Sequence, residues 1–483
     1  MQEFETVIGL EVHVELLTDT KLFCGCSTAF GADPNSQVCP VCLGLPGVTT
    51  PLLNKKAVEY TIKAALALNC QITPSVAFDR KNYFYADLPK GFQVSQFFHP
   101  MGRDGYVELR INGEKRRIGI HQLHLEEDTG KLSHIGDIIS SPYSRVDYNR
   151  AGVPLMEIVS EPDIRTAEEA RLYLQKLRSI LRYLGISDCK MEEGSMRCDA
   201  NISIRPVGST VLGNKTELKN MNSFRSVFRG IEYEEERQRS VLISGETVIP
   251  ETRHWDENSG VTKAMRGKLV SADYRCFPDP RIPPYPASPQ WVQEIRESIP
   301  ELPDARYLRF TKEHGLPAAS AEVITGIKEL ADFYDGVLSF HNDPKTVSNW
   351  ITGELLGHLN AAGLEITESK IKPEDLGKLL QSLAKGDISG KIGKTVFEEM
   401  FKTGKGPLEI IKEQGLTQIS DTDTLSRVID SVLAANPGSL EDYRGGKTKA
   451  VGFLVGQIMK ETKGQANPKL LNEMLLKKLS ADH

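Results

Sequence analysis

The chain has 483 residues, of which 40% are hydrophobic, 26% charged and 7% aromatic, and its formal net charge is −6. Its length predicts about three domains, and its composition excludes a largely disordered chain and a global basic field for nucleic acid. No segment approaches the roughly 18 consecutive apolar residues of a membrane-spanning helix, and the N-terminus lacks a secretion-signal pattern. We therefore expect a cytoplasmic protein without a membrane partner.

The first predicted strand runs from Thr6 to Leu16, because apolar and polar residues alternate there. Its opposite face carries Glu11, His13 and Glu15. A histidine between two carboxylates at this spacing suits a metal ion or a carboxylate partner, and a surface hydrogen-bonding role is also compatible with the pattern. The apolar face contains Ile8, Leu10, Val12, Val14 and Leu16.

Four cysteines follow as two close pairs, Cys24 with Cys26 and Cys39 with Cys42, separated by twelve residues. Two short loops of this kind can present four thiolates tetrahedrally to Zn²⁺ and leave no open coordination position. The spacing therefore predicts a structural zinc site, with chance clustering of small buried residues or a redox pair as alternatives. The scattered cysteines are predicted to be small buried residues: Cys70, Cys189, Cys198 and Cys276.

A basic and aromatic segment comes next, with Arg80 and Lys81 before Tyr83, Phe84 and Tyr85, and with Lys90 shortly after. This combination suits a phosphate clamp, and it also suits RNA. The Gly-Lys-Thr tripeptides at 393–395 and 446–448 lack the upstream glycine of a P-loop, so we interpret them as helix-end or loop residues. The chain also lacks a nucleophile-elbow motif and a glutaminase cysteine motif, so it shows no means of releasing ammonia itself.

Three further segments place polar groups where a strand is expected. An acidic cluster at His124 to Asp128 follows an apolar run, and two others have polar residues at two-residue spacing. A sheet with one apolar face and one face of carboxylates, imidazole and lysine could hold divalent cations and the phosphates that they neutralise. Taken singly, each polar face is more often the solvent side of a strand. The polar residues of the latter two are Asp199, Asn201, Ser203 and Arg205, and Lys215, Glu217 and Lys219.

One helix is predicted from Thr166 to Leu184, because the segment begins with a capping box and is followed by Gly185. A second helix is predicted from Ser223 onward. Six prolines between Pro278 and Pro289 predict a domain boundary, and the sequence beyond is mainly helical in pattern. Residues 436–478 contain eight Lys or Arg and four Asp or Glu, which suits a solvated helical face or an RNA contact. The predicted domains are residues 1–290, 291–405 and 406–483.

Five segments give the chain a family resemblance and occur in the family order. They are residues 8–16 (IGLEVHVEL), 78–85 (FDRKNYFY), 147–163 (DYNRAGVPLMEIVSEPD), 191–199 (MEEGSMRCD) and 452–460 (GFLVGQIMK). In them the chain closely resembles the GatB family, the B subunits of the bacterial aspartyl/glutamyl-tRNA amidotransferases. The resemblance implies a cradle-like α/β catalytic domain with a mixed or antiparallel sheet, an all-α helical domain and a small α-helical tail domain that binds tRNA.

The resemblance also implies a reaction. ATP and Mg²⁺ convert the side-chain carboxylate of Glu on tRNA(Gln), or of Asp on tRNA(Asn), into an acyl phosphate, which ammonia converts to the amide. A separate amidase subunit supplies the ammonia, and a third, small subunit completes a heterotrimer. A competing hypothesis is a non-catalytic, zinc-containing scaffold that only binds tRNA.

Roles for individual residues follow from the resemblance. The expected Mg²⁺ ligands are Glu11, His13, Glu126, Glu127 and Asp199, and the expected catalytic residues are Glu11, His13, Glu127, Glu217 and Ser195. The expected nucleotide-phosphate ligands are Arg80, Lys81, Lys90 and Lys219. The expected tRNA contacts are Lys447, Lys449, Lys460 and Lys463. Ser195 and Arg197 are expected to position the aminoacyl group or to support a loop, and Asn149 and Arg150 to contact substrate or to hold a turn.

Overall fold

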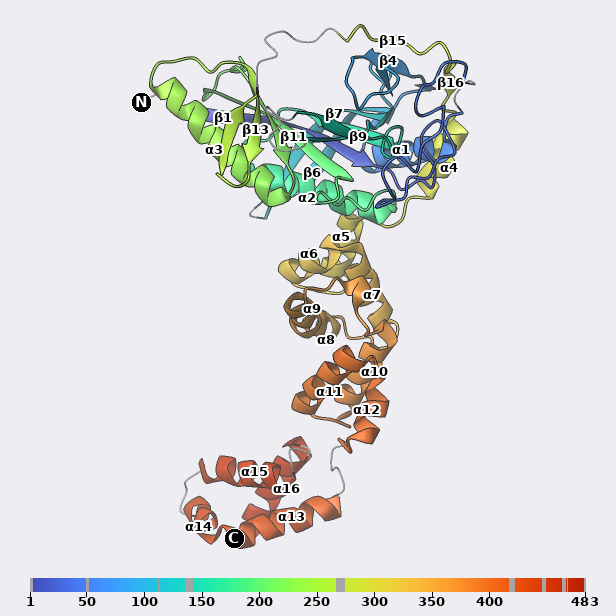
Figure 1. Ribbon diagram of the computed structural model, residues 1–483. Helices are drawn as coiled ribbons and strands as arrows, with labels where there is room; N and C mark the ends of the chain where they lie inside the picture. The colour runs from blue at the N-terminus through green and yellow to red at the C-terminus, as the bar shows by residue number, and fades with distance from the viewer. Residues whose placement is uncertain are drawn as a thin grey trace. The chain divides into compact units, whose positions relative to one another are not determined.

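The computed structural model describes residues 3–48, 52–111, 113–134, 142–265, 274–416, 422–444, 449–462, 466 and 468–481. The chain divides into two compact units, Met1–Pro303 and Asp304–His483. Figure 1 shows that the first combines a large sheet with helices and that the second is helical. None of the described helices has both the length and the apolar composition needed to span a lipid bilayer.

Nine strands of the described first unit form one mixed sheet, which agrees with the predicted fold class. The neighbouring strands pair antiparallel except for β12 and β13, which are parallel. In spatial order they are β14 (Val261–Ala264), β13 (Glu251–Asp256), β12 (Thr216–Met221), β11 (Met196–Pro206), β1 (Phe4–Glu15), β10 (Pro154–Ser160), β7 (Glu114–Glu127), β6 (Gly102–Ile111) and β2 (Gln71–Ile72).

Helices cover the apolar face of this sheet. The helices α1 (Lys55–Ala67), α2 (Ala167–Leu184) and α3 (Phe224–Ile243) pack against its strands, and Figure 1 shows α2 and α3 along one side of it. The alternate apolar residues from Ile8 to Leu16 are at most 3% exposed, as the sequence predicts. Because successive residues of a strand point to opposite faces, their burial directs Glu11 and His13 away from the helices.

The helix α2 has Thr166 at its start and Gly185 at its end, as the sequence predicts. However, the Glu169 carboxylate accepts the backbone N–H of Arg165 and not that of Thr166, which a capping box requires. Thr166 accepts a hydrogen bond from the backbone N–H of Glu169 at 3.1 Å, and Gly185 takes the left-handed conformation (φ +68°) that ends α2. Ser223 accepts from the N–H of Ser226 at 3.0 Å and starts α3.

Three small sheets accompany the large one. The first contains β15 (Phe277–Pro278), β4 (Asp79–Asn82) and β5 (Phe92–Ser95), and β5 contacts β7. The others pair β16 (Tyr285–Pro286) with β3 (Ser75–Val76) and β8 (Lys131–His134) with β9 (Ser144–Asp147).

The proline-rich segment does not end the first compact unit. It begins in β15 and contains β16, so both of its ends are tied to the first unit by strand pairing or packing. The helix α4 (Pro289–Glu297) packs on α1, and Ile295 is only 7% exposed in the main core. The predicted limits at residues 290 and 405 stay predictions, while the compact unit continues to Pro303.

The second unit consists of short helices. Its first group includes α5 (Pro303–Lys312), α6 (Ala318–Gly326), α7 (Lys328–Leu338), α8 (Pro344–Asn349), the π-helix η1 (Trp350–Leu355), α9 (Leu356–Ala362), the 3₁₀ helix η2 (Ile366–Glu368), α10 (Pro373–Lys385), α11 (Gly390–Thr403) and α12 (Pro407–Glu413). The last four are α13 (Thr422–Ala435), α14 (Pro437–Arg444), α15 (Lys449–Glu461) and α16 (Pro468–Ala481), around an apolar core of their own.

The Gly-Lys-Thr tripeptide at 393–395 lies near the N-terminus of α11, which agrees with its interpretation as a helix-end feature. Lys394 Nζ is 2.6 Å from the carboxylate of Glu354 and so has an ordinary surface partner. The tripeptide at 446–448 lies outside the described residues.

Candidate metal and nucleotide site

Four neighbouring strands bring a row of ionisable side chains together on the face of the main sheet that the helices leave open. The register places His13 of β1 opposite both Glu157 of β10 and Arg197 of β11. It also places Glu157 opposite His124 of β7. Side chains of directly opposed residues lie on the same face and within reach of one another. The row across the sheet therefore runs from Arg197 through His13 and Glu157 to His124.

His13, Glu126 and Glu157 form the tightest part of this face. The Nε2 atom of His13 is 3.5 Å from Glu157 Oε2 and 3.9 Å from Glu126 Oε1. One ligand atom from each residue lies within 4.8 Å of the other two. His124 joins from β7, with Nε2 3.1 Å from Glu157 and 3.5 Å from Glu126. An imidazole and two carboxylates this close together fit a divalent cation.

The charges in this group compensate one another. Burial raises the pKa of Glu157, but the rings of His124 and His13 outweigh burial and hold that pKa well below its ordinary value. Burial lowers the pKa of both histidines, yet the carboxylates of Glu157 and Glu126 outweigh it and raise the pKa of His124 to about 10. Among the described residues, the buried Nδ1 atom of His124 has no hydrogen-bond partner. The protons on the two imidazole rings supply the positive charge that balances the carboxylates. A divalent cation can supply that charge instead, because metal binding displaces protons from the ligands.

A second group of carboxylates lies beside the first, toward β12. Glu11 accepts a hydrogen bond from Asn201 Nδ2 at 2.9 Å, and burial, together with neighbouring carboxylates, raises the pKa of Glu11. Lys219 Nζ is 2.9 Å from Glu217 and also contacts Asp199. The predicted residues Glu11, Asp199, Glu217 and Lys219 are thus neighbours on the open face.

Glu127 lies apart from Glu126, because adjacent residues of β7 point to opposite faces. Its Oε1 atom accepts the backbone N–H of Val94 at 2.9 Å and forms an ion pair with Lys90. Both side chains are at most 10% exposed. The two neighbouring glutamates therefore do not face one site, and a predicted metal ligand and a predicted phosphate ligand are paired with each other.

The other basic residues of this region also have partners. Arg80 Nε is 3.0 Å from Asp279, whose side chain is fully buried, and Arg281 reaches the same carboxylate at 3.0 Å. Lys81 Nζ lies 5.0 Å from the centre of the Tyr274 ring, a cation–π distance. Of these, Lys81 has no carboxylate partner within ion-pair distance in the described part of the chain.

Asp128, directly after β7, anchors two arginines. Its Oδ2 atom is 2.6 Å from Arg197 Nη2 and 3.4 Å from Arg150 Nε, and its side chain is 2% exposed. Burial, and then the Asp128 charge, raise the pKa of Glu15 to about 8. Through its ion pair with Arg197, the Asp128 carboxylate holds that arginine at the end of the row of ionisable side chains.

Ser195 and Asn149 are built into loops. Ser195 Oγ accepts the backbone N–H of Lys190 at 2.9 Å and donates to Asp188, which closes the loop before β11. Asn149 Nδ2 donates to the carbonyl of Asp33 at 2.7 Å. These contacts favour the loop-supporting interpretation over a substrate contact for both residues.

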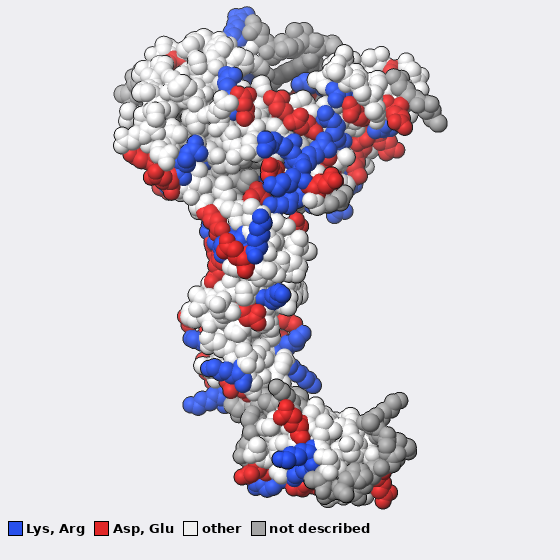
Figure 2. Space-filling model, turned by 180° about the vertical axis from the view of Figure 1, so that it is seen from behind, with Lys and Arg blue, Asp and Glu red and all other residues white. Residues whose placement is uncertain are grey.

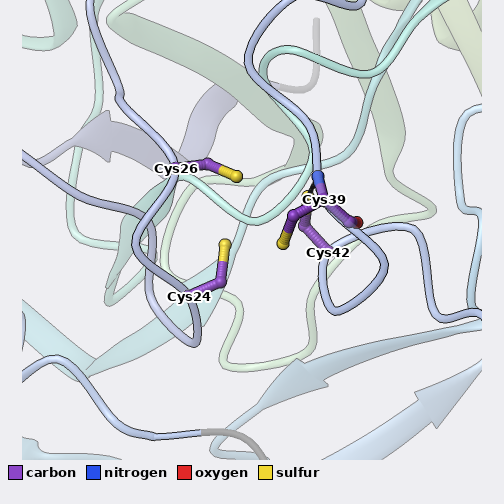
Figure 3. Close-up of side chains that lie close together, drawn as sticks. All are labelled: Cys24, Cys26, Cys39 and Cys42. Carbon is purple, nitrogen blue, oxygen red and sulfur yellow. Dashed lines mark hydrogen bonds between the residues drawn. The ribbon is translucent and has the colours of Figure 1, made fainter. Parts of the chain in front are cut away.

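The four paired cysteines point toward a common centre (Figure 3). Their sulfur atoms all lie within 4.8 Å of one another. With Zn–S bonds of about 2.3 Å, tetrahedral sulfurs stand roughly 3.8 Å apart, so the side chains need only small shifts to bind the ion. A hydrogen bond from the Cys24 thiol, chiefly, lowers the pKa of Cys42 to about 4. The cluster can therefore bind a metal ion.

The predicted tRNA contacts lie mostly outside what the structure describes. Lys447 and Lys463 fall outside the described residues, and so does the side chain of Lys449. Lys460 is exposed in the last turn of α15. On the face that Figure 2 shows, acidic and basic side chains are interspersed, and a group of Lys and Arg side chains on the first unit is bordered by Asp and Glu.

Two residues of the tightest cluster were missed by the sequence analysis, which gave no role to Glu157 and placed His124 only within an acidic cluster. For Glu157 the sequence contains one weak indication. Glu157 is the only charged residue of β10, PLMEIVS, and a lone carboxylate in an otherwise apolar strand needs a partner.

Comparison with known proteins assigns the chain to a family. Residues 6–293, more than half of the chain, match the GatB/GatE catalytic domain, and residues 332–479 match the GatB domain. The chain belongs to the GatB family. It is 58% identical to the aspartyl/glutamyl-tRNA(Asn/Gln) amidotransferase B subunit of Carboxydothermus hydrogenoformans over 480 residues, which are 99% of this chain and 100% of the relative. The B subunits of the same name from Moorella thermoacetica and Caldanaerobacter subterraneus subsp. tengcongensis are 55% and 56% identical, each over 99% of this chain and 100% of the relative.

The family matches agree with the layout of the structure. The GatB/GatE catalytic match begins in β1 and ends in α4, so it includes both the carboxylate and histidine cluster and the cysteine site. The GatB domain match begins in α7 and ends in α16. The resemblance that the sequence segments indicated is thereby confirmed.

Proposed function

We propose that this GatB-family chain uses ATP to activate the side-chain carboxylate of Glu or Asp esterified to tRNA, and then amidates it with ammonia. Membership of the family supports the reaction class. The assignment of the chemistry to particular residues depends on one observation, the cluster of His13, Glu126 and Glu157 on the open face of the sheet. A scaffold that only binds tRNA would have no use for carboxylates buried beside two histidines.

The reaction needs activation because a carboxylate would have to expel oxide. A carboxylate oxygen of the aminoacyl side chain attacks the γ-phosphorus of ATP, and the bond from that phosphorus to ADP breaks. Ammonia then attacks the acyl carbon, inorganic phosphate leaves with the electron pair, and the new amide nitrogen loses a proton. Mg²⁺ supplies positive charge that offsets the repulsion between the anionic reactants.

His13, Glu126 and Glu157 are the residues that we propose to bind one Mg²⁺ ion, with Glu11, Asp199 and Glu217 beside it for a second. Lys81, which has no carboxylate partner among the described residues, is the best-placed phosphate ligand. Lys219 lies within the second group, where it is paired with Asp199 and Glu217. Arg197, held by Asp128, is suited to the carboxylate of the aminoacyl group, because a guanidinium binds a carboxylate through two parallel hydrogen bonds. Arg80, Lys90 and Glu127 would have to exchange their present partners to take part.

The proposal requires other molecules. From the family resemblance we infer that a separate amidase subunit supplies the ammonia, that a small third subunit completes a heterotrimer, and that the complex works in the cytoplasm. The lack of an ammonia-releasing motif in this chain is compatible with that division of work. The helical tail would bind tRNA, with Lys447, Lys449, Lys460 and Lys463 as the candidate phosphate contacts. An acidic chain needs such local basic contacts to hold a polyanion.

Replacing His13 by Ala is expected to lower ATP-dependent amidation about 100-fold, since loss of one metal ligand removes on the order of 3 kcal/mol of transition-state stabilisation. The assay uses the complete assembly with misacylated tRNA and ammonium chloride, so that it bypasses glutamine hydrolysis. The affinity for tRNA, measured in parallel, should stay within about twofold. Retained turnover in the variant would favour the scaffold hypothesis instead.

We also propose that the four cysteines bind one structural zinc ion. Changing Cys39 and Cys42 to Ser together is expected to reduce bound zinc from about one ion per chain to nearly none, measured by mass spectrometry of the purified protein, because two of the four thiolates are lost. Cys276→Ser, remote in sequence from both pairs, is the control and should keep its zinc. If the unaltered chain, the Cys39 and Cys42 double variant and Cys276→Ser all contained equal amounts of zinc, the proposed site would be refuted.

A further inference from the structure

Lys21 is a lysine with almost no contact with water. It lies six residues beyond the end of β1 and is only 1% exposed, and it is among the largest fully buried side chains of the described residues. Its ammonium nitrogen is 3.2 Å from the carbonyl oxygen of Tyr148 and 3.7 Å from the sulfur of Cys42. Lysine is almost never fully buried unless its charge is paired. The question is what carries the compensating negative charge.

A carboxylate does not fill that role in the described part of the chain, where none lies within ion-pair distance of Lys21. Glu127 lines the same small cavity, of about 20 Å³, but its carboxylate is paired with Lys90. A carbonyl oxygen supplies a dipole and no net charge. The sulfur of Cys42 is the remaining partner.

The state of the cysteines decides whether Lys21 is compensated. Four neutral thiols, or two disulfides, would leave a buried ammonium ion without a counter-charge, which is costly. Four thiolates around one Zn²⁺ carry a net charge of −2, and an adjacent ammonium ion reduces it to −1. The burial of Lys21 therefore requires a thiolate at Cys42, which a tetrathiolate metal site supplies and which four neutral thiols or two disulfides do not.

We infer that Lys21 is a positioning residue of the metal site: it supplies the internal positive charge and a hydrogen bond to the Cys42 thiolate, and it makes the site hold zinc more tightly. The inference rests on the proposed binding of zinc by the four cysteines. It adds a fifth residue, from outside both cysteine pairs, on which the stability of that site depends.

The same residue ties the metal site to the open face of the sheet. Lys21 Nζ binds the carbonyl of Tyr148, and the next residue, Leu22, donates its N–H to the carbonyl of Gly152 at 2.8 Å. Gly152 in turn donates to the carbonyl of Asp128 at 2.9 Å, directly beyond the end of β7. The metal site, through Lys21, thus fixes the loop that supports Asp128.

The test compares Lys21→Met with Lys21→Arg. Methionine has a similar length without charge, and replacing a buried charge by an apolar residue of like size is often neutral or stabilising for a fold. We expect the Met variant to hold zinc roughly 10- to 100-fold less tightly in a chelator competition at fixed pH, as is typical when a partner of a metal ligand is lost. The Arg variant, which keeps the charge, should stay within about threefold of the unaltered chain.

A second readout does not depend on affinity. With Co²⁺ in place of zinc, loss of the positive charge beside Cys42 should shift the thiolate-to-cobalt charge-transfer band to lower energy in Lys21→Met and leave it in place in Lys21→Arg. Lys63→Met is the matched control: Lys63 is a partly buried lysine of α1 whose pKa is lowered by burial. It should change neither the affinity nor the spectrum.

The outcomes separate the two levels of the proposal. If the unaltered chain contains no bound metal and its four cysteines are oxidised, the zinc site itself is refuted. If the unaltered chain holds zinc and Lys21→Met holds it equally tightly with an unshifted cobalt band, only the role of Lys21 is refuted. Equal losses of zinc affinity in the Met and Arg variants would also contradict the role of charge. If the Met variant does not fold, a loss of zinc affinity well beyond threefold in Lys21→Arg contradicts that role by itself.

Discussion

Replacing Glu157 by Gln is expected to reduce ATP-dependent amidation on the order of a thousandfold. Glu157 lies between His13 and His124, at 3.5 and 3.1 Å, and its low pKa keeps it anionic. The amide has nearly the same shape but no charge, so it should weaken the proposed metal site without opening a cavity. Loss of about 4 kcal/mol of metal-dependent stabilisation of the transition state corresponds to roughly this factor.

The chain provides a matched control for this substitution. Glu161 follows β10 by one residue and forms an exposed pair with His121 at 2.9 Å, so Glu161→Gln removes a Glu–His contact that lies outside the cluster of His13, Glu126 and Glu157. Its activity should stay within about twofold. The assay is release of ADP and formation of the amide on misacylated tRNA with ammonium chloride, over a range of Mg²⁺ concentrations. If the two variants had equal activities, Glu157 would have no role as a metal ligand.

The strand β1 shows what the sequence alone could predict. The alternation of apolar and polar residues in β1 is a local pattern. The five apolar residues could therefore be assigned to the buried face, and Glu11 and His13 to the opposite face, from residues adjacent in the sequence. The same holds for α2, whose cap and final glycine lie within a few residues of its ends. The cysteine site belongs here as well, because the spacing of two short loops is a local feature.

The composition of the site could not be predicted in the same way. Glu157 meets His13 and His124 only through the register of three strands that are far apart in the sequence. The assignment of Glu126 and Glu127 depends on where β7 ends, because one residue decides the face to which a side chain points. Arg80 looked like a free phosphate ligand because its partner, Asp279, lies 199 residues away.

This pairing has a measurable consequence: Asp279→Asn is expected to destabilise the first unit by about 2 to 4 kcal/mol. The Asp279 side chain is fully buried and receives hydrogen bonds from both Arg80 and Arg281. Burial raises its pKa, but the two arginines outweigh burial and lower it to about 2. Asparagine would leave two partly buried guanidinium groups without a counter-charge. The melting temperature of the first unit, followed by calorimetry, should fall by roughly 5 to 10 °C.

The pH dependence distinguishes loss of this charge from a general packing defect. Because the folded-state pKa of Asp279 is below its ordinary value of 3.8, its contribution to stability is present above pH 3.8 and is lost as the pH falls toward about 2. The difference in melting temperature between the unaltered chain and Asp279→Asn should therefore become smaller as the pH falls from 3.8 toward 2. A packing defect would lower the melting temperature by the same amount at every pH. Glu108→Gln is the control, since Glu108 also contacts two cations, Lys115 and Arg117, but in an exposed position where ion pairs contribute little. A melting temperature for Asp279→Asn as high as that of this control would show that the buried pairs of Asp279 stabilise the first unit no more than exposed pairs do.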